Sequence, residues 1–241
     1  MEKIVGILGG MGPEATVDLM QRIIQLTPAL DDRDHIRCIV DNNPKVPSRI
    51  KAIIEGDGED PGPCMAEMAG KLESWGADFL VIACNTAHYY YDAVQQAVHI
   101  PVINMIDLVS HHVKINFPEQ NKIGILASPA VAMTGLYSKR FKKFGIKDIW
   151  PDPDYQASLF KVIKEIKKGN TGSTVRDAYE KVCEHLLKKD IKTAIIACTE
   201  LSALDSSLPI NIIDAAQVLA MEIVQIAKNS KKLASFAGPD A

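Results

Sequence analysis

Two short segments near opposite ends of the chain constrain its fold more than any other feature. Residues 81–83 run into Cys84, and residues 195–197 run into Cys198. Each is an apolar run, rich in isoleucine or valine and closed by polar residues, which is typical of a buried strand. Ligands and catalytic groups of open α/β folds gather where such strands end. Two thiols in two equivalent places favour a reaction that needs one thiol on each side of a substrate.

An internal duplication extends this correspondence to most of the chain. Residues 122–129 resemble residues 3–10, with Gly124 opposite Gly6 at an offset of 118, while the two cysteines lie 114 apart. A similar short apolar segment follows each cysteine, at 100–107 and 208–214. Three pairs in the same order indicate duplication, and the period is far too long for a solenoid. We predict an α/β fold of two pseudo-symmetric three-layer α/β/α half-domains, each with a mainly parallel four-stranded sheet.

The predicted boundaries follow from this duplication. We expect an N-terminal domain over 1–104 and a C-terminal domain over 105–214, with a closing helix at 215–228 that packs back on the first domain. Residues 231–241 carry no pattern, and we expect them to be frayed. The strands expected in the first half are 3–8, 36–40, 77–83 and 101–104. The other expected helices are 14–26, 50–55, 64–75, 85–98, 105–117, 155–168 and 175–189.

Charge and cysteine usage exclude several classes of protein. The net charge is −3, which gives no electrostatic footprint for nucleic acid. The sequence contains no run of 18 apolar residues and no signal peptide, so we expect no membrane association and a cytoplasmic location. The five cysteines form no CxxC pair, which argues against a disulfide framework or a zinc ribbon. Free thiols are therefore expected.

Cys84 and Cys198 have a structural interpretation and a chemical one. Free cysteine is among the most buried residue types, so either alone could be a core residue. Their matching positions, each with a threonine within two residues, favour chemistry. A cysteine just before a helix feels oriented N–H groups that increase its thiolate fraction. The same N–H groups and the hydroxyls of Thr86 and Thr199 could hold a substrate carboxylate.

The glycine-rich segment after the first strand allows two interpretations. Residues 10–15 fit the G-x-G-x-x-A pattern of dinucleotide-binding loops. Pro13 removes one amide from that turn, and Asp41 lies further along than the usual acidic partner. A glycine loop that approaches a small substrate suits the duplicated design better.

A functional role and a purely structural role are also possible for Arg49 and His88. Arg49 follows a proline-rich loop at the end of a strand, where it could bind a carboxylate with two hydrogen bonds or simply lie on the surface. His88 lies four residues after Cys84, a spacing that a metal site allows, but no second pair of ligands supports it. We therefore predict no metal site.

The sequence contains four motifs: residues 9–13, Asn42-Asn43-Pro44 with Pro47 and Arg49, residues 84–88 and residues 198–200. With these motifs it resembles the aspartate/glutamate racemase family, and most of all the aspartate racemases within it. The resemblance extends from Gly6 to about Lys228. It implies a cofactor-independent enzyme of two pseudo-symmetric domains with the active site in the cleft between them.

The resemblance also assigns roles to individual residues. It makes Cys84 and Cys198 catalytic, and it places the family's lysine before a Gly-Asn turn on Lys167, although Lys168 is adjacent. It implies an acidic amino acid as the small-molecule partner, and we expect a homodimer. The expected substrate-binding residues are Met11, Arg49, Asn85, Thr86, Ala87, Lys167, Thr199 and Glu200.

The expected reaction is the interconversion of L- and D-aspartate, with glutamate as a second substrate. Two thiols would remove and return the α-proton on opposite faces of the α-carbon. A broad-specificity amino-acid racemase, or another isomerase of a small dicarboxylate, is the alternative among enzymes. A two-lobed protein that binds a small acid without chemistry is the rival from another class. The symmetric cysteine pair argues against that rival, because a binding protein has no use for it.

Overall fold

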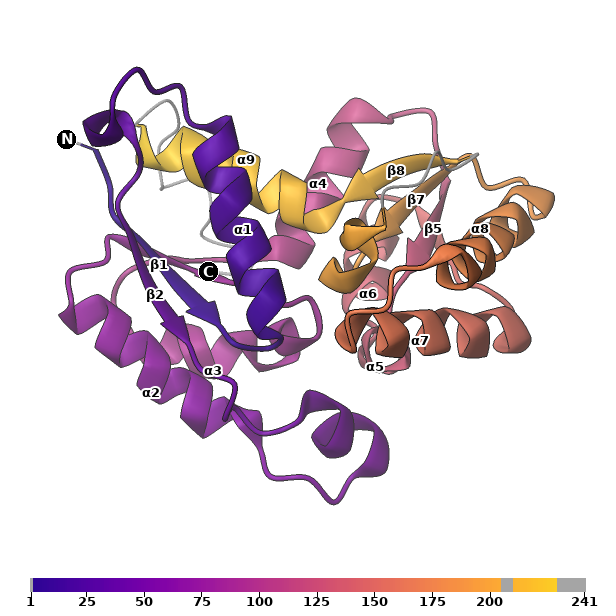
Figure 1. Cartoon of the computed structure of the whole chain (residues 1–241), viewed down its shortest axis with the longest axis horizontal. Helices are drawn as coiled ribbons and strands as arrows, with labels where there is room; N and C mark the ends of the chain where they lie inside the picture. Colours follow the sequence, from indigo (N-terminus) through magenta and orange to yellow (C-terminus); the bar gives the residue numbers. More distant parts are fainter. Residues whose placement is uncertain (1, 205–209, 229–241) are drawn as a thin grey trace. The chain divides into compact units, whose positions relative to one another are not determined.

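The computed structural model describes residues 2–204 and 210–228, which divide into two compact units (Figure 1). The first unit holds the described residues of Met1–Met105 and Gln217–Ala241, and the second holds those of Ile106–Ala216. The tail at 231–241 and the start of the apolar segment at 208–214 lie outside the described residues. None of the described helices is long and apolar enough to cross a membrane.

The first unit is built on a parallel four-stranded sheet. Its strands follow the order β2-β1-β3-β4, and each neighbouring pair is parallel. Every residue of β1 and β3 is buried. A strand buried on both faces is apolar at every position, which explains the continuous apolar runs in the sequence. The strands are β1 (Val5–Gly9), β2 (Cys38–Asn42), β3 (Phe79–Ile82) and β4 (Val102–Ile103).

Helices cover both faces of this sheet. On one face, Leu80 and Ile82 pack with the buried side chains of α2 (Pro61–Ser74), including Leu72. The helices α1 (Pro13–Leu26) and α9 (Ala215–Ala227) lie on the other side of β1 in Figure 1. Short elements of the unit include α3 (Tyr91–Gln96), a 3-10 turn η1 (Asp32–Asp34) and a π-helical turn η2 (Lys51–Glu55).

The C-terminal helix α9 is bonded to the first unit at both ends. Arg22 Nη1 donates to Gln217 Oε1 at 2.9 Å, which joins α1 to the start of α9. The backbone N–H of Lys3 donates to the carbonyl of Ala227 at 3.0 Å. The chain therefore returns to its first unit after it has completed the second.

The second unit repeats the sheet of the first. Its strands follow the order β6-β5-β7-β8, and again each neighbouring pair is parallel. The helices α7 (Pro153–Lys167) and α8 (Ser173–Lys188) bury Leu159, Val182 and Leu186 in a core cluster with Leu126 and Ile196 of the strands. The strands are β5 (Lys122–Leu126), β6 (Lys147–Ile149), β7 (Thr193–Ile196) and β8 (Asn211–Asp214); the other helices are α4 (Met105–Asn116), α5 (Pro129–Thr134) and α6 (Leu136–Lys143).

Each unit contains an equivalent backbone hydrogen bond in addition to the same strand order. The N–H of Ala83 donates to the carbonyl of Leu8 at 3.0 Å, and the N–H of Ala197 donates to the carbonyl of Leu126 at 2.9 Å. Each bond closes the ladder one residue before a cysteine. The glycines that aligned in the sequence are also equivalent, because a Cβ on Gly6 would meet Leu80 and Leu72, and one on Gly124 would meet Ala194 and Leu186. The predicted duplication of two parallel α/β halves is confirmed.

The structure differs from the sequence predictions in two places. The strand β6 and the helices α5 and α6 fall in a stretch for which the sequence predicted no element. The segments after the two cysteines were expected to be helical; the first continues into α3 (Tyr91–Gln96), but neither begins as an α-helix. They form five-residue 3-10 turns, η3 (Thr86–Tyr90) and η4 (Thr199–Ala203). Periodicity over five residues cannot separate a 3-10 turn from the first turn of an α-helix.

The glycine loop before α1 generates a test of the fold. Gly10 has φ +86°, and a Cβ there would lie 2.2 Å from the backbone of Asn43. Gly76 has φ +96° with nothing within 4 Å of its Cβ position. Both Gly→Ala variants carry the cost of a positive φ, but only Gly10→Ala adds an overlap, which costs about 1–3 kcal/mol more. We expect urea unfolding to show a larger loss for Gly10→Ala, and equal losses would contradict this packing.

Candidate active site

Both thiols follow the strands at which the strand order of their sheets reverses. β1 pairs with β2 on one side and β3 on the other, and β5 pairs with β6 and β7 in the same way. Loops at such a reversal are where open α/β sheets bind ligands. Cys84 comes two residues after β3 and Cys198 two residues after β7, and both are partly buried free cysteines. Each unit therefore presents one thiol at its expected ligand-binding edge.

His88 holds the backbone at Cys84. Its Nδ1 lies 2.8 Å from the carbonyl oxygen of Cys84, and its Nε2 accepts the N–H of Met105 at 3.0 Å. Because Nε2 accepts, the proton sits on Nδ1 and the ring is neutral in this arrangement. The side chain is 3% exposed and uses both nitrogens in these bonds. We conclude that His88 fixes the turn after Cys84, which is the structural alternative to a metal ligand.

Four expected binding residues surround Cys84 with different exposure. Met11 and Ala87 are buried and belong to the apolar cluster against which Cys84 packs. Asn85 is also buried, whereas Thr86 is half-buried. Met11 and Ala87 therefore form part of the core at this edge, and Thr86 is the more accessible polar side chain next to the thiol.

Arg49 ties two loops of the first unit together. Its Nη1 donates to the carbonyls of Val46 and Pro47 at 3.3 and 3.0 Å, and its Nη2 donates to the carbonyl of Met11 at 3.1 Å. These bonds use three of the five N–H groups of a guanidinium. The loops after β1 and β2 are thereby held together. Two N–H groups remain for a carboxylate, and none of the described acidic side chains forms an ion pair with Arg49.

In the second unit, three expected site residues form a chain of polar contacts. Cys198 Sγ donates to Glu200 Oε2 at 2.9 Å, and Lys167 Nζ lies 3.0 Å from Glu200 Oε1. The Glu200 side chain is 12% exposed and that of Lys167 is 50% exposed. Lys168 instead pairs with Glu165 on the exposed side of α7. The geometry therefore favours Lys167 over its neighbour as the site lysine. Thr199, which opens η4 between the thiol and the carboxylate, is half-buried.

The carboxyl of Glu200 stays ionised despite its burial. Burial by itself raises its pKa, but the charge of Lys167 and hydrogen bonds that include those from Cys198 and Lys167 lower it more. The net effect is a pKa below the usual value for glutamate. The thiol of Cys198 therefore faces an anion.

The turns that follow the two cysteines offer little structural basis for the expected helix-dipole effect. A macrodipole arises from aligned peptide units along an α-helix. The five-residue turns η3 and η4 align few of them. The two cysteines therefore differ mainly in the side chains that lie next to them.

Three buried polar groups near the carboxyl ends of β5 and β7 were not predicted as site residues from the sequence. Ser128 Oγ, Gln156 Oε1 and Tyr179 OH are buried without a hydrogen-bond partner among the described residues. Gln156 Nε2 donates to the carbonyl of Ala127 at 2.8 Å, which places Gln156 beside Ser128. Tyr179 is close enough to Cys198 for an electrostatic interaction, and burial raises the pKa of its hydroxyl. Only Ser128 had a sequence signal, because the duplication aligns it with Gly10.

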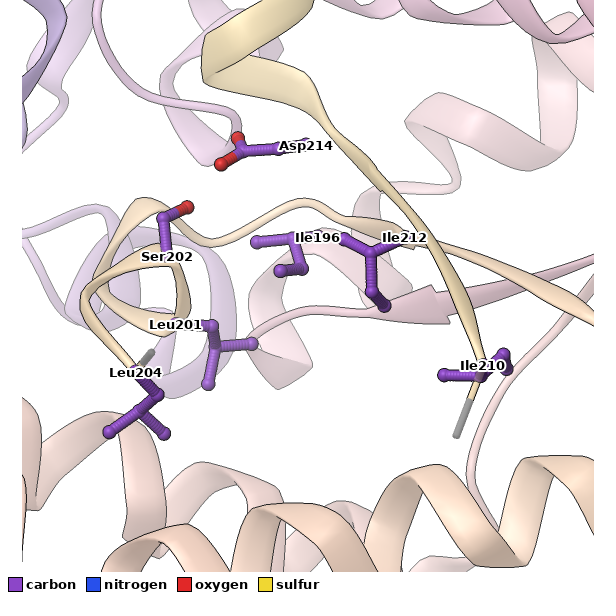
Figure 2. Close-up of a pocket in the computed structure, with 7 residues that line it drawn as sticks. All are labelled: Ile196, Leu201, Ser202, Leu204, Ile210, Ile212 and Asp214. Atoms are coloured by element: carbon purple, nitrogen blue, oxygen red, sulfur yellow. The ribbon is translucent and has the colours of Figure 1, made fainter. Parts of the chain in front are cut away.

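A cavity of about 310 Å³ lies beside η4 and β8 in the second unit (Figure 2). Its described lining is mostly apolar, with the polar side chains of Ser202 and Asp214 at one side. Cys198 and Glu200 are not among the described lining residues. The apolar members are Ile196, Leu201, Leu204, Ile210 and Ile212.

Comparisons with known proteins identify the family of the chain. The Asp/Glu/Hydantoin racemase family model matches residues 8–223. The broad specificity amino-acid racemase RacX of Bacillus subtilis (strain 168) is 30% identical over 233 residues, which cover 92% of this chain and 96% of that protein. The glutamate racemase of Aquifex pyrophilus is 27% identical over 173 residues, 68% of this chain and 64% of that protein.

A solved structure shows the same likeness in three dimensions. The aspartate racemase of Picrophilus torridus superimposes with a TM-score of 0.82 at 31% sequence identity, and the match covers 94% of each chain. The sequence match, the paired parallel sheets and this structural likeness together show that the chain belongs to the Asp/Glu/Hydantoin racemase family and is an isomerase.

Proposed function

We propose that this protein racemises an acidic amino acid, aspartate in preference to glutamate, with Cys84 and Cys198 as its two acid–base groups. The equivalent placement of the two thiols is the observation that carries the proposal. Each follows the strand beside the reversal of strand order, one residue beyond the same ladder bond. A duplicated scaffold that retains a thiol at both positions suits a reaction in which two faces of one carbon are treated alike.

The chemistry needs a base on one face of the α-carbon and an acid on the other. A free thiol has a pKa of about 8.5, so it exchanges a proton readily near neutral pH. The α-proton of an amino acid is far less acidic, and the carbanion-like transition state must be stabilised by oriented amides and cations. We propose that groups of the protein supply this stabilisation without an organic cofactor, as the family resemblance implies.

Arg49 is the group that we assign to the acidic substrate. It keeps two N–H groups beyond its three bonds to backbone carbonyls, and a guanidinium binds a carboxylate with two parallel hydrogen bonds. Lys167, by contrast, already pairs with Glu200. We therefore expect Arg49 to contribute more to the choice of an acidic substrate than Lys167.

A broad-specificity amino-acid racemase is the second candidate function. The 30% identity with RacX, over nearly the whole of both chains, supports it. One methylene changes binding by about 1–3 kcal/mol, and no motif of this chain encodes a choice between aspartate and glutamate. Substrate range therefore has to be measured.

The first experiment tests the two thiols. Purified protein is given L-aspartate, L-glutamate or L-alanine without added cofactor, and the D-enantiomers are followed by chiral chromatography. We expect Cys84→Ala and Cys198→Ala each to lower the rate by roughly 10²–10⁴-fold, because each removes the acid–base group of one face. A variant that keeps most of its activity in both directions would contradict the two-thiol proposal.

The other cysteines provide the controls. Burial raises the pKa of Cys38 to about 11 and that of Cys183 to about 12, so both stay protonated at neutral pH. Cys64 also has a raised pKa, first because of burial and then because of nearby carboxylates. Cys38→Ala, Cys64→Ala and Cys183→Ala should leave activity largely intact.

The second experiment tests the choice of substrate. We expect Arg49→Ala to raise the KM for aspartate about tenfold or more, since a hydrogen bond to a charged group contributes about 1.5–3 kcal/mol. The KM for alanine, if alanine is turned over, should change far less. Arg33→Ala, at an exposed arginine of the same unit, is the matched control. Equal losses for aspartate and alanine would show that Arg49 serves the α-carboxylate or the loops, and the acidic-substrate proposal would fail.

A further inference from the structure

The two thiols have different charged neighbours. Counting two residues beyond each cysteine gives Thr86 in the first unit and Glu200 in the second. The threonine is neutral, whereas the carboxyl of Glu200 is held ionised and accepts a hydrogen bond from Cys198. The duplicated scaffold thus carries a chemical difference at one equivalent position.

We propose that Glu200, held by Lys167, keeps Cys198 as a protonated thiol in the free enzyme, so that Cys198 starts the reaction as the acid and Cys84 as the base. This rests on the proposed function for the roles of acid and base, but the protonation of Cys198 does not. Glu200 is then a positioning residue, which acts on the substrate only through the thiol.

The contacts explain why the thiol form is favoured. A hydrogen bond from sulfur to a carboxylate exists only while sulfur carries its proton, and a thiolate at 2.9 Å from that carboxylate would be repelled. Lys167 has the opposite influence on a thiolate, but its ammonium contacts the other oxygen, Oε1. The carboxylate therefore lies between the sulfur and the ammonium in the chain of contacts.

Two further described groups near Cys198, Tyr179 and Asp214, do not favour the thiolate. Tyr179 of α8 lies within electrostatic range of Cys198, and its hydroxyl stays neutral because burial raises its pKa. Asp214 at the end of β8 interacts electrostatically with the same tyrosine. Together with Glu200 and Lys167, these are described titratable groups that interact with Cys198 directly or through a shared neighbour.

The proton balance of one turnover follows from this assignment. The thiolate of Cys84 takes the α-proton, and the S–H of Cys198 gives its proton to the opposite face of the carbanion. Cys84 then holds a proton and Cys198 is a thiolate, so exchange with water restores the starting state. Because L- and D-enantiomers are equally stable, kcat/KM is the same in both directions, and the asymmetry must be measured on the thiols themselves.

The test is the pH dependence of alkylation without substrate. The protein is treated with iodoacetamide over a range of pH, and the modification of each cysteine-containing peptide is measured by mass spectrometry. The pH midpoint is compared rather than the rate, because it does not depend on exposure. We expect the midpoint of Cys198 to lie above that of Cys84 in the wild-type protein.

Two substitutions should move the Cys198 midpoint in opposite directions. Glu200→Gln removes the anion and leaves the charge of Lys167, so the midpoint should fall by about one pH unit, which is about tenfold more thiolate at neutral pH. Lys167→Met leaves the carboxylate without its cation, so the midpoint should rise. Glu165→Gln is the matched control, because Glu165 forms the equivalent exposed pair with Lys168. The Cys84 midpoint should stay constant throughout.

An unchanged Cys198 midpoint in Glu200→Gln, or shifts of the same sign in Glu200→Gln and Lys167→Met, would overturn the proposal. Loss of folding alone cannot produce shifts of opposite sign, and circular dichroism checks each variant. The readout needs no turnover. A protein that racemises no amino acid yet shows both shifts would therefore refute the proposed function and leave the protonation of Cys198 intact.

Discussion

Both thiols owe their positions to the backbone ladders between the first and third strands of each unit. β1 pairs with β3 and β5 with β7, and each ladder closes at the residue before a cysteine. Register in such a sheet is specified by close packing, because a shift of one residue turns each side chain to the other face, where its volume no longer fits the neighbouring side chains. All residues of β3 and β7 are buried. The hydrophobic core thus fixes where the sulfur atoms lie.

The same scaffold gives the two thiols different surroundings. Cys84 is followed by a turn that a neutral histidine holds, whereas Cys198 contacts an ionised carboxylate. The duplicated fold determines where each thiol lies, whereas a single neighbouring side chain determines whether the thiol of Cys198 keeps its proton. The chain belongs to the Asp/Glu/Hydantoin racemase family, and the two-thiol reaction is our proposal for its chemistry.

The parts that could be predicted from the sequence are those determined by burial. The strands β1, β3, β5 and β7 are central in their sheets, so they are apolar along most of their length and easy to recognise. The edge strand β6 covers only Lys147–Ile149 and includes an exposed lysine, so it leaves no comparable pattern. The 3-10 turns after the cysteines were mistaken for α-helices because five residues carry too little periodicity.

The candidate site was predictable as a set of residues but not as a set of contacts. Glu200 and Lys167 both appeared as binding residues, and their pairing requires that α7 and η4 meet in space. Arg49 was recognised from its loop, but its three bonds to backbone carbonyls could not be foreseen. The sequence did not mark Ser128, Gln156 and Tyr179 as site residues. They became candidates because each buries a side-chain oxygen that has no hydrogen-bond partner among the described residues.

The central claim is that separate thiols remove and return the α-proton, and deuterium transfer tests it most directly. The enzyme is allowed to act on protiated L-aspartate in D₂O, and early D-aspartate is examined by mass spectrometry. Because the thiol that delivers the proton has exchanged with solvent, we expect early product to carry deuterium at the α-carbon while the remaining L-aspartate stays protiated. Early D-aspartate that keeps the substrate's own proton would show a single base and contradict the two-thiol mechanism.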